Sequence, residues 1–140
     1  MKVLIDTNII LDVVLKRSPF DEDSYKVLKY AEEGFIEGYI ASFVVTDLYY
    51  FIEKDLGHDK AAKAIKSLLN IVKLVGITRK DIERAMENLT INDLEDALQI
   101  QCAKKIKADF VITRDNKLKK LMIKAISPSE FVERFQGDKF

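Results

Sequence analysis

The sequence predicts an α/β fold: a three-layer α/β/α sandwich with a central, mostly parallel sheet of about five strands. Short apolar runs that suit strands buried on both faces alternate along the chain with longer helical patterns. Such alternation is typical of parallel sheets whose strands are joined by helices. The 140 residues contain neither repeats nor linker-like segments. We therefore expect a single domain over residues 1–140.

The first half of the chain supplies three of the predicted strands. Val3–Ile5 is a continuous apolar run, and a helical pattern follows it over residues 8–16 until Ser18 and Pro19 interrupt it. Ser42 has the residue type of an N-cap and is expected to begin an apolar helix. The other elements expected here are helices over 21–33, 42–56 and 59–69, and strands over 39–41 and 71–75.

The second half continues the alternation. Asn92 and Glu95 have the spacing of a capping box, which predicts that a helix begins there. Ser127 followed by Pro128 is a typical start for the last helix. The elements expected here are helices over 79–88, 92–106, 116–122 and 128–135, and strands over 110–113 and 125–126. In parallel sheets, functional residues gather beyond the carboxyl ends of the strands.

Composition excludes several classes of function. The apolar runs are too short to cross a membrane, so we expect a cytoplasmic protein with no membrane partner. One cysteine, Cys102, excludes an internal disulfide and thiolate-rich zinc sites, and its apolar helical neighbours predict a buried thiol. One histidine, His58, excludes nucleases that use two histidines as acid and base. Any chemistry must therefore be performed by carboxylates.

Two aspartates follow predicted strands. Asp6 comes directly after Val3–Ile5, and Asp115 follows the strand over residues 110–113. Each aspartate could simply cap the next helix, which is a common role for this residue. If the two strands lie in one parallel sheet, however, their carboxyl ends share an edge and the two carboxylates meet in one crevice.

Asp47 lies in an unusual setting for an acid. On a helix its neighbours three and four residues away are Phe43, Val44, Tyr50 and Phe51, all apolar or aromatic. An uncompensated carboxylate in such a stripe costs several kcal/mol. We therefore expect Asp47 to serve a site rather than to be a surface charge, although an internal salt bridge would also explain it.

Asp96 shares a helix face with Ile100 and Ala103. Asp93, one turn earlier, suits the positive end of the helix dipole, which explains Asp93 better than Asp96. Several carboxylates in one pocket repel one another unless a cation compensates them. Oxygen ligands favour a hard divalent cation such as Mg²⁺ or Mn²⁺, which suits phosphate chemistry.

Four motifs in order resemble the PIN-domain nucleases, especially the VapC-type toxins. They are Asp6-Thr7-Asn8, Asp47 within Asp47-Leu48-Tyr49-Tyr50, Asp93-Leu94-Glu95-Asp96-Ala97, and Thr113-Arg114-Asp115. The resemblance implies a ribonuclease that binds Mg²⁺ or Mn²⁺ through Asp6, Asp96 and Asp115. It also implies an acidic contribution from Asp47, where the family usually has glutamate, and orienting roles for Asn8 and Thr113. It leaves open whether Asp47 and Asp93 also bind metal.

The expected partners follow from the same resemblance. They are single-stranded or structured RNA, a second copy of the chain in a homodimer, and an antitoxin protein if the chain is a toxin. The net charge of zero means that RNA must be attracted by local patches, for which Lys104, Lys105 and Lys107 are the first candidates.

Two other classes of function remain to be weighed. A phosphoacceptor regulatory domain would carry paired acids after the first strand, where this chain has Asp6 alone. A catalytically inactive PIN-scaffold module that binds RNA or protein is the other alternative. The complete set of acids favours the enzyme, because an idle acidic cluster would destabilise the fold.

Overall fold

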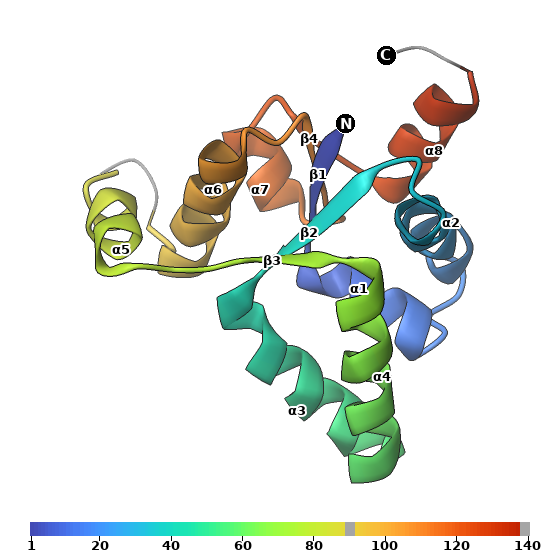
Figure 1. Ribbon diagram of the computed structural model, residues 1–140. Helices are drawn as coiled ribbons and strands as arrows, with labels where there is room; N and C mark the ends of the chain where they lie inside the picture. The colour runs from blue at the N-terminus through green and yellow to red at the C-terminus, as the bar shows by residue number, and fades with distance from the viewer. Residues whose placement is uncertain (89–91, 138–140) are drawn as a thin grey trace.

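The computed structural model describes residues 1–88 and 92–137 and contains a five-stranded sheet with helices on both sides (Figure 1). The strand order is β3-β2-β1-β4-β5, and every neighbouring pair is parallel. The predicted fold class is confirmed. The strands are β1 (Lys2–Ile5), β2 (Glu37–Ala41), β3 (Lys73–Val75), β4 (Phe110–Ile112) and β5 (Ala125–Ile126).

The helices agree with the predicted elements to within a few residues at their ends. Helices α5 and α6 lie to one side of the strands, and α2 and α4 lie to the other (Figure 1). The helices are α1 (Thr7–Val14), α2 (Asp21–Glu32), α3 (Val45–Leu56), α4 (His58–Ile71), α5 (Arg79–Met86), α6 (Leu94–Ile106), α7 (Asn116–Leu121) and α8 (Pro128–Gln136).

Two predicted helix starts are wrong. Ser42 makes no capping hydrogen bond; it begins a 3₁₀ turn (Ser42–Val44) that precedes α3. Asn92 is not the N-cap of α6 either. The carboxylate of Asp93 accepts a hydrogen bond from the amide of Asp96 (3.1 Å), so the helix begins one residue later. Asn92 and Glu95 therefore do not form the predicted capping box.

The core is built around the sheet. Val3, Leu4 and Ile5 of β1 have no exposed surface, as expected of a central strand covered on both faces. Gly38 in β2 permits close approach of the layers, because an added Cβ would lie 3.2 Å from atoms of Ala31 and Ile5. The predicted burial of Cys102 is confirmed, and burial raises the pKa of its thiol to about 11.

The strand order places the functional candidates. Strands β1 and β4 are neighbours with Ile5 opposite Ile112, and the amide of Asp6 donates to the carbonyl of Ile112 (3.0 Å). The segments that follow these strands therefore leave the sheet side by side. Among the described residues, no helix combines the length and the apolar character that a membrane span needs.

Candidate active site

Asp6 lies at the centre of a group of polar side chains beyond the carboxyl ends of β1 and β4. Its Oδ2 accepts a hydrogen bond from the Thr113 hydroxyl (2.7 Å), and its Oδ1 accepts one from the Thr7 amide (2.7 Å). Longer bonds come from the side-chain amides of Asn8 (3.5 Å) and Gln99 (3.4 Å). These contacts fix the direction of the carboxylate, so Asn8 and Thr113 lie where orienting residues are needed.

The electrostatics of Asp6 differ from those of an ordinary helix cap. Burial raises the pKa of its carboxyl, and the negative charges of Asp115 and Asp96 raise it further. The hydrogen bonds from Thr113 and the Thr7 amide act in the opposite direction. The structure thus brings Asp6, Asp96 and Asp115 into one electrostatic group whose mutual repulsion is incompletely compensated.

The segment after β4 positions Asp115 through the backbone. Thr113 is fully buried, and its hydroxyl oxygen also accepts a hydrogen bond from the Asp115 amide (3.0 Å). Asp115 in turn caps α7 by accepting from the amide of Lys117 (2.9 Å). Asp115 therefore has both roles considered from the sequence: it is an N-cap, and it belongs to the acidic group.

The start of α6 contributes the remaining acids of the predicted set. Asp96 is 8% exposed, in agreement with its place on the apolar face, whereas Asp93 is only half-buried. The ammonium of Lys117 lies 3.3 Å from Asp93 Oδ2 and 3.2 Å from Asp96 Oδ2. The Asp96 contact is an ion pair without hydrogen-bond geometry. Lys117 is thus the cation that pairs with the acids at the start of α6.

The expected burial of Asp47 is wrong. Asp47 is exposed on the first turn of α3, and the aromatic neighbours that suggested burial, Tyr50 and Phe51, are themselves 59% and 42% exposed. The buried face of α3 is formed by Leu48 and Ile52 instead. Asp47 is nevertheless close enough to the site to act on Glu95, because its charge contributes to raising the pKa of that carboxyl.

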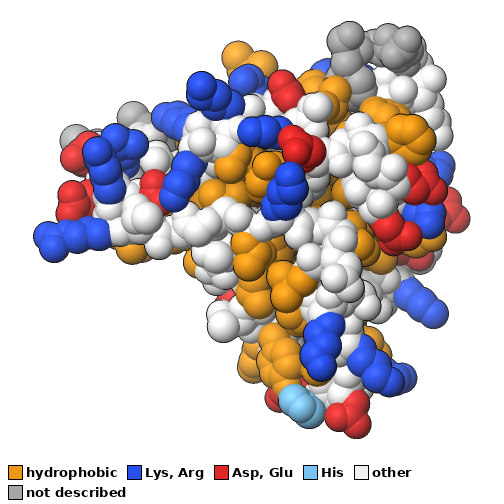
Figure 2. All heavy atoms as spheres, in the orientation of Figure 1, with side chains coloured by type: hydrophobic (Ala, Val, Ile, Leu, Met, Phe, Trp, Pro, Cys, Tyr) orange, Lys and Arg blue, Asp and Glu red, His pale blue; other side chains and the backbone are white. Residues whose placement is uncertain are grey.

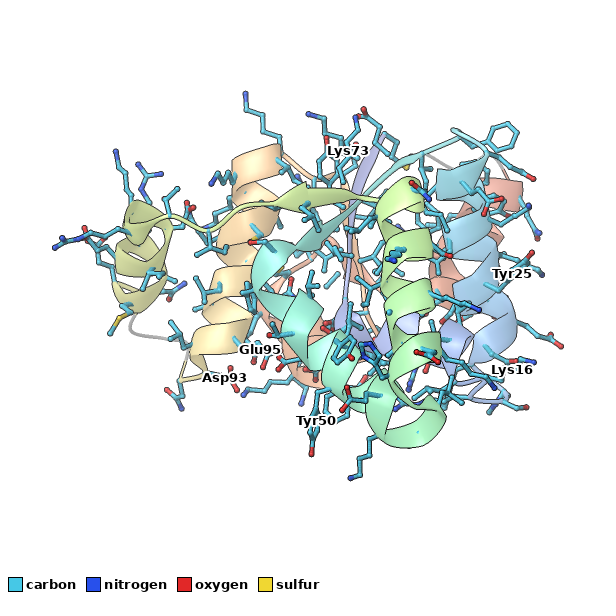
Figure 3. The ribbon with its side chains drawn as sticks, turned by 60° about the horizontal axis from the view of Figure 1, so that its bottom comes forward. Lys16, Tyr25, Tyr50, Lys73, Asp93 and Glu95 are labelled. Atoms are coloured by element: carbon cyan, nitrogen blue, oxygen red, sulfur yellow. The ribbon has the colours of Figure 1, made fainter. Side chains whose placement is uncertain are left out.

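Glu95 is a site residue that the sequence reasoning missed. It stands beside Asp93 at the start of α6 (Figure 3). Partial burial is the main cause of its raised pKa, followed by the charges of Asp47 and then of Asp6. Glu95 therefore lies close enough to both Asp47 and Asp6 for their charges to act on its carboxyl. From the sequence, Glu95 was assigned to a capping box instead. The signal that could have identified it is the run of three acids within four residues, Asp93, Glu95 and Asp96.

Asp12 and Arg114 form a second polar contact that the sequence reasoning missed. Asp12 is fully buried in α1, and Arg114 binds it through two hydrogen bonds of 2.8 and 2.7 Å. The hydroxyl of Ser24 donates to Asp12 Oδ2 as well (3.1 Å). Because Arg114 lies between Thr113 and Asp115, this ion pair anchors the segment that carries both. An acid within the otherwise apolar α1 was the signal for it.

The donor atoms suit a hard cation. The described residues contain four buried side-chain oxygens without a hydrogen bond, and all belong to this site: Thr7 Oγ1, Asn8 Oδ1, Asp96 Oδ2 and Gln99 Oε1. Asp96 Oδ2 has an ion-pair partner in Lys117, and native proteins leave few atoms like the other three without a hydrogen bond. Within residues 1–88 and 92–137, no three acidic, histidine or cysteine side chains converge closely enough to enclose a metal ion. The oxygen donors at this site are nevertheless of the kind that Mg²⁺ and Mn²⁺ bind.

Comparisons with known proteins show what the chain is similar to. The chain is 27% identical over 138 residues to Ribonuclease VapC1 of Aquifex aeolicus, covering 96% of this chain and 95% of that protein. Among solved structures, VapC20 of Mycobacterium tuberculosis, described as a sarcin-ricin loop cleaving toxin, has a TM-score of 0.70 at 15% identity, covering 85% of this chain and 94% of that one.

VapBC2 of Rickettsia felis, solved with promoter DNA, has a TM-score of 0.67 at 20% identity, covering 86% of this chain and 92% of that one. At these identities the two structures show a shared fold. The family model described as PIN domain matches residues 2–117, which include the segments that carry Asp6, Asp47, Asp96 and Asp115. The chain therefore belongs to the PIN-domain family.

Proposed function

We propose that the protein is a metal-dependent endoribonuclease that cleaves single-stranded RNA, in the manner of a VapC-type toxin. The observation that carries the proposal is the group formed by Asp6, Asp96 and Asp115 at the carboxyl edge of the sheet, where burial first and then the charges of Asp115 and Asp96 raise the pKa of Asp6. Membership of the PIN-domain family and similarity to a protein named a ribonuclease support it. The reaction is hydrolysis: water attacks phosphorus and a P–O bond of the RNA backbone breaks.

Each residue has a role in this proposal. Asp6, Asp96 and Asp115 hold Mg²⁺ or Mn²⁺, and Asn8, Gln99 and Thr113 keep the Asp6 carboxylate directed into the site. A divalent cation there supplies positive charge that favours ionisation of water and stabilises the negative charge on the transferring phosphoryl group.

The carboxylates at the rim orient the attacking water. The charge of Asp47 contributes to raising the pKa of Glu95, so the two carboxylates lie near each other, and both can accept hydrogen bonds from that water. Asp93 caps α6 and binds Lys117, so we assign it to holding Asp96 in place rather than to binding metal.

The test is cleavage of a labelled single-stranded RNA with Mg²⁺ or Mn²⁺ and with EDTA. We expect cleavage that EDTA stops and that Asp6→Asn and Asp96→Asn each abolish. Asp59→Asn, a change to an exposed acid on the first turn of α4, is the matched control and should cleave normally. Undiminished cleavage by either site variant would refute the assignment. RNA binding without cleavage by the folded wild type would instead favour the inactive PIN-scaffold module.

We also propose that the protein forms a homodimer and binds an antitoxin protein. Exposed apolar side chains on α3 support an interface: Tyr50, Phe51 and Leu56. Figure 2 shows hydrophobic side chains along the lower part of the molecule, over α3 and α4. Similar folds occur in structures of toxin–antitoxin complexes, including one from Klebsiella pneumoniae. Sedimentation at micromolar concentration should show a dimer that Phe51→Ser weakens and Tyr25→Ser, a change to another exposed aromatic, leaves intact.

A further inference from the structure

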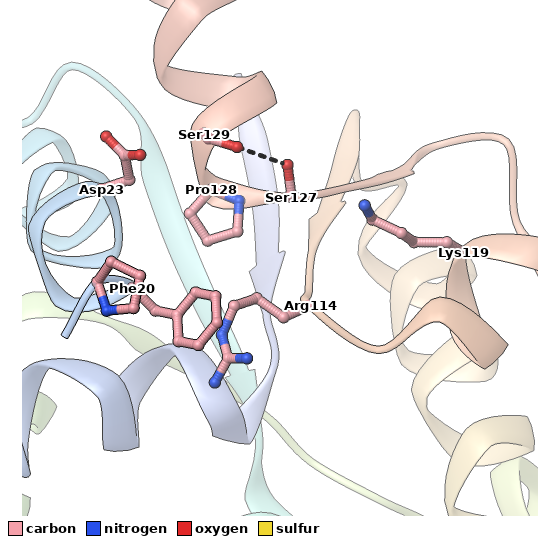
Figure 4. Close-up of a pocket in the computed structure, with 8 residues that line it drawn as sticks. Phe20, Asp23, Arg114, Lys119, Ser127, Pro128 and Ser129 are labelled. Carbon is pink, nitrogen blue, oxygen red and sulfur yellow. Dashed lines mark hydrogen bonds between the residues drawn. The ribbon is translucent and has the colours of Figure 1, made fainter. Parts of the chain in front are cut away.

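A pocket adjoins the candidate active site at the same edge of the sheet. It has a volume of about 420 Å³ and lies between the start of α2, the segment after β4 and the start of α8 (Figure 4). Strand order is the reason for its place, because β1, β4 and β5 are consecutive neighbours. Asp6 follows β1, Arg114 follows β4 and Ser127 follows β5. The pocket therefore adjoins the acidic group, with which it shares the segment after β4.

Two segments contribute to both the pocket and the acidic group. In the segment after β4, Thr113 and Asp115 belong to the acidic group, and Arg114 between them lines the pocket. In α7, Lys117 binds Asp96, and Lys119 lines the pocket. An RNA strand whose phosphate lies at the acidic group can thus place a neighbouring nucleotide here.

The pocket wall combines apolar surface with hydrogen-bonding groups. Phe20 is 46% exposed, and the Arg114 guanidinium lies over its ring at 3.9 Å from the centroid. Pro19 and Pro128 add further apolar surface, and the hydroxyls of Ser127 and Ser129 stand 3.1 Å apart at the rim (Figure 4). The carboxylate of Asp23, whose Oδ1 lies 4.0 Å from the Lys26 ammonium, is a further acceptor in this wall. Single-stranded RNA is recognised by this combination, through stacking on aromatic or Arg planes and bonds to base edges.

The charges of the pocket favour a base over a phosphate. Arg114 already binds the carboxylate of Asp12, and Lys119 binds Glu130 at 3.1 Å. The amino end of α8 is also occupied, because Ser127 and Glu130 form a reciprocal capping box there. Arg114, Lys119 and the amino end of α8 therefore leave no uncompensated positive charge to bind an anion. A flat, neutral group with polar edges suits the pocket better.

We propose that this pocket binds one nucleobase of the RNA strand, next to the scissile phosphate. The proposal rests on the proposed ribonuclease function and names a specificity subsite for it. Phe20 provides the stacking surface. Asp23 accepts hydrogen bonds from an exocyclic amino group, which adenine, cytosine and guanine carry and uracil lacks, so these three bases are favoured over uracil.

The test measures binding of fluorescein-labelled hexaadenylate, hexacytidylate and hexauridylate to the full chain in EDTA, by fluorescence anisotropy. Phe20→Leu should weaken binding at least about fivefold, since stacking on an aromatic side chain contributes that much or more per base. Tyr25→Leu is the matched control, because Tyr25 is an exposed aromatic of α2 outside the pocket, and it should bind like the wild type. Unchanged binding by Phe20→Leu, or no measurable binding by the wild type, would overturn the proposal.

A second variant separates recognition from a structural effect on Arg114. Asp23→Asn leaves the Phe20–Arg114 contact in place, and it should reduce the preference for hexaadenylate and hexacytidylate over hexauridylate. An unchanged order of affinities would contradict the role of Asp23. Failure of the proposed function gives a different result: a wild type that binds RNA through Phe20 but cuts none with Mg²⁺ refutes the activity alone. A wild type that cuts RNA, with binding unaffected by Phe20→Leu, refutes the subsite alone.

Discussion

Two groups of acids in this molecule, one around Asp81 and one around Asp6, have opposite electrostatic settings. Asp81, at the start of α5, accepts hydrogen bonds from Lys105 (2.8 Å), Gln101 (3.2 Å) and the Thr78 amide (2.9 Å). These contacts, with the Lys105 bond foremost, hold the pKa of Asp81 well below its usual range. Asp6, at the sheet edge, has its pKa raised by burial first and then by the charges of Asp115 and Asp96.

The difference separates a structural acid from a candidate catalytic one. Asp81 is compensated by its own protein, so its ionised form stabilises the contact between α5 and α6. Asp6 and Asp96 lack full compensation, so their charges remain available to a cation that the solution supplies. A carboxyl such as Asp6, whose pKa is raised by burial and by neighbouring charges, is a candidate for a functional site.

Asp12 resembles Asp81 in being fully compensated, and its loss should have the largest effect on stability. Asp12→Asn leaves the Arg114 guanidinium, which is 25% exposed, without its charged partner. We expect a loss of about 3 kcal/mol in the free energy of unfolding, measured by urea denaturation. A loss within experimental error would show that this ion pair does not anchor the segment carrying Thr113 and Asp115.

The pH dependence of stability should distinguish the two groups by its sign. The folded pKa of Asp81 is lowered, so its stabilisation is present above its ordinary pKa of 3.8 and is lost as pH falls below it. The folded pKa of Asp6 is raised, so the cost of its ionised form appears as pH rises above 3.8.

The comparison of variants follows from these signs. In EDTA between about pH 3 and 7, the destabilisation by Asp81→Asn should grow with pH, whereas Asp6→Asn should gain stability relative to the wild type. Denaturant unfolding at a series of pH values measures both. If the stability of the two variants relative to the wild type changed with pH in the same direction, the proposed electrostatic difference between Asp81 and Asp6 would be wrong.

Lys117 should have the smallest effect on stability and a clear effect on metal binding. Its side chain is 56% exposed, so its ion pairs with Asp93 and Asp96 contribute little to folding. The ammonium nevertheless competes with a cation for Asp96 Oδ2. Lys117→Met should tighten Mn²⁺ binding severalfold in calorimetric titration, with Lys120→Met, a change to an exposed lysine of the same helix, as the control. Weaker binding by Lys117→Met would contradict this competition.

The sequence allowed the fold to be predicted because each strand is a compact apolar run and each helix has its own periodicity. Asp6 and Asp115 could be placed for the same reason, since both follow strands of a parallel sheet. Burial of Asp47 could not be judged, because helical spacing does not show which of two apolar faces meets the core. Leu48 and Ile52 take that position, and Tyr50 and Phe51 remain exposed.

Contacts between distant segments were also beyond the sequence. Arg114 binds Asp12 across 102 positions of the chain, and Gln99 reaches Asp6 across 93. One of the lysines that were candidates for RNA binding, Lys105, binds the carboxylate of Asp81 instead. Figure 2 still shows Lys and Arg side chains gathered over α5 and α6, where Lys80, Arg84 and Lys104 surround the Asp81 contact.

The most direct test of the central claim is thermal unfolding with EDTA and with Mn²⁺. If the acids at the sheet edge form a cation site, Mn²⁺ should raise the melting temperature of the wild type and of Asp81→Asn alike, by preferential binding to the folded state. The rise should be much smaller for Asp6→Asn and Asp96→Asn. Equal rises in all four proteins, or no rise in the wild type, would contradict the account.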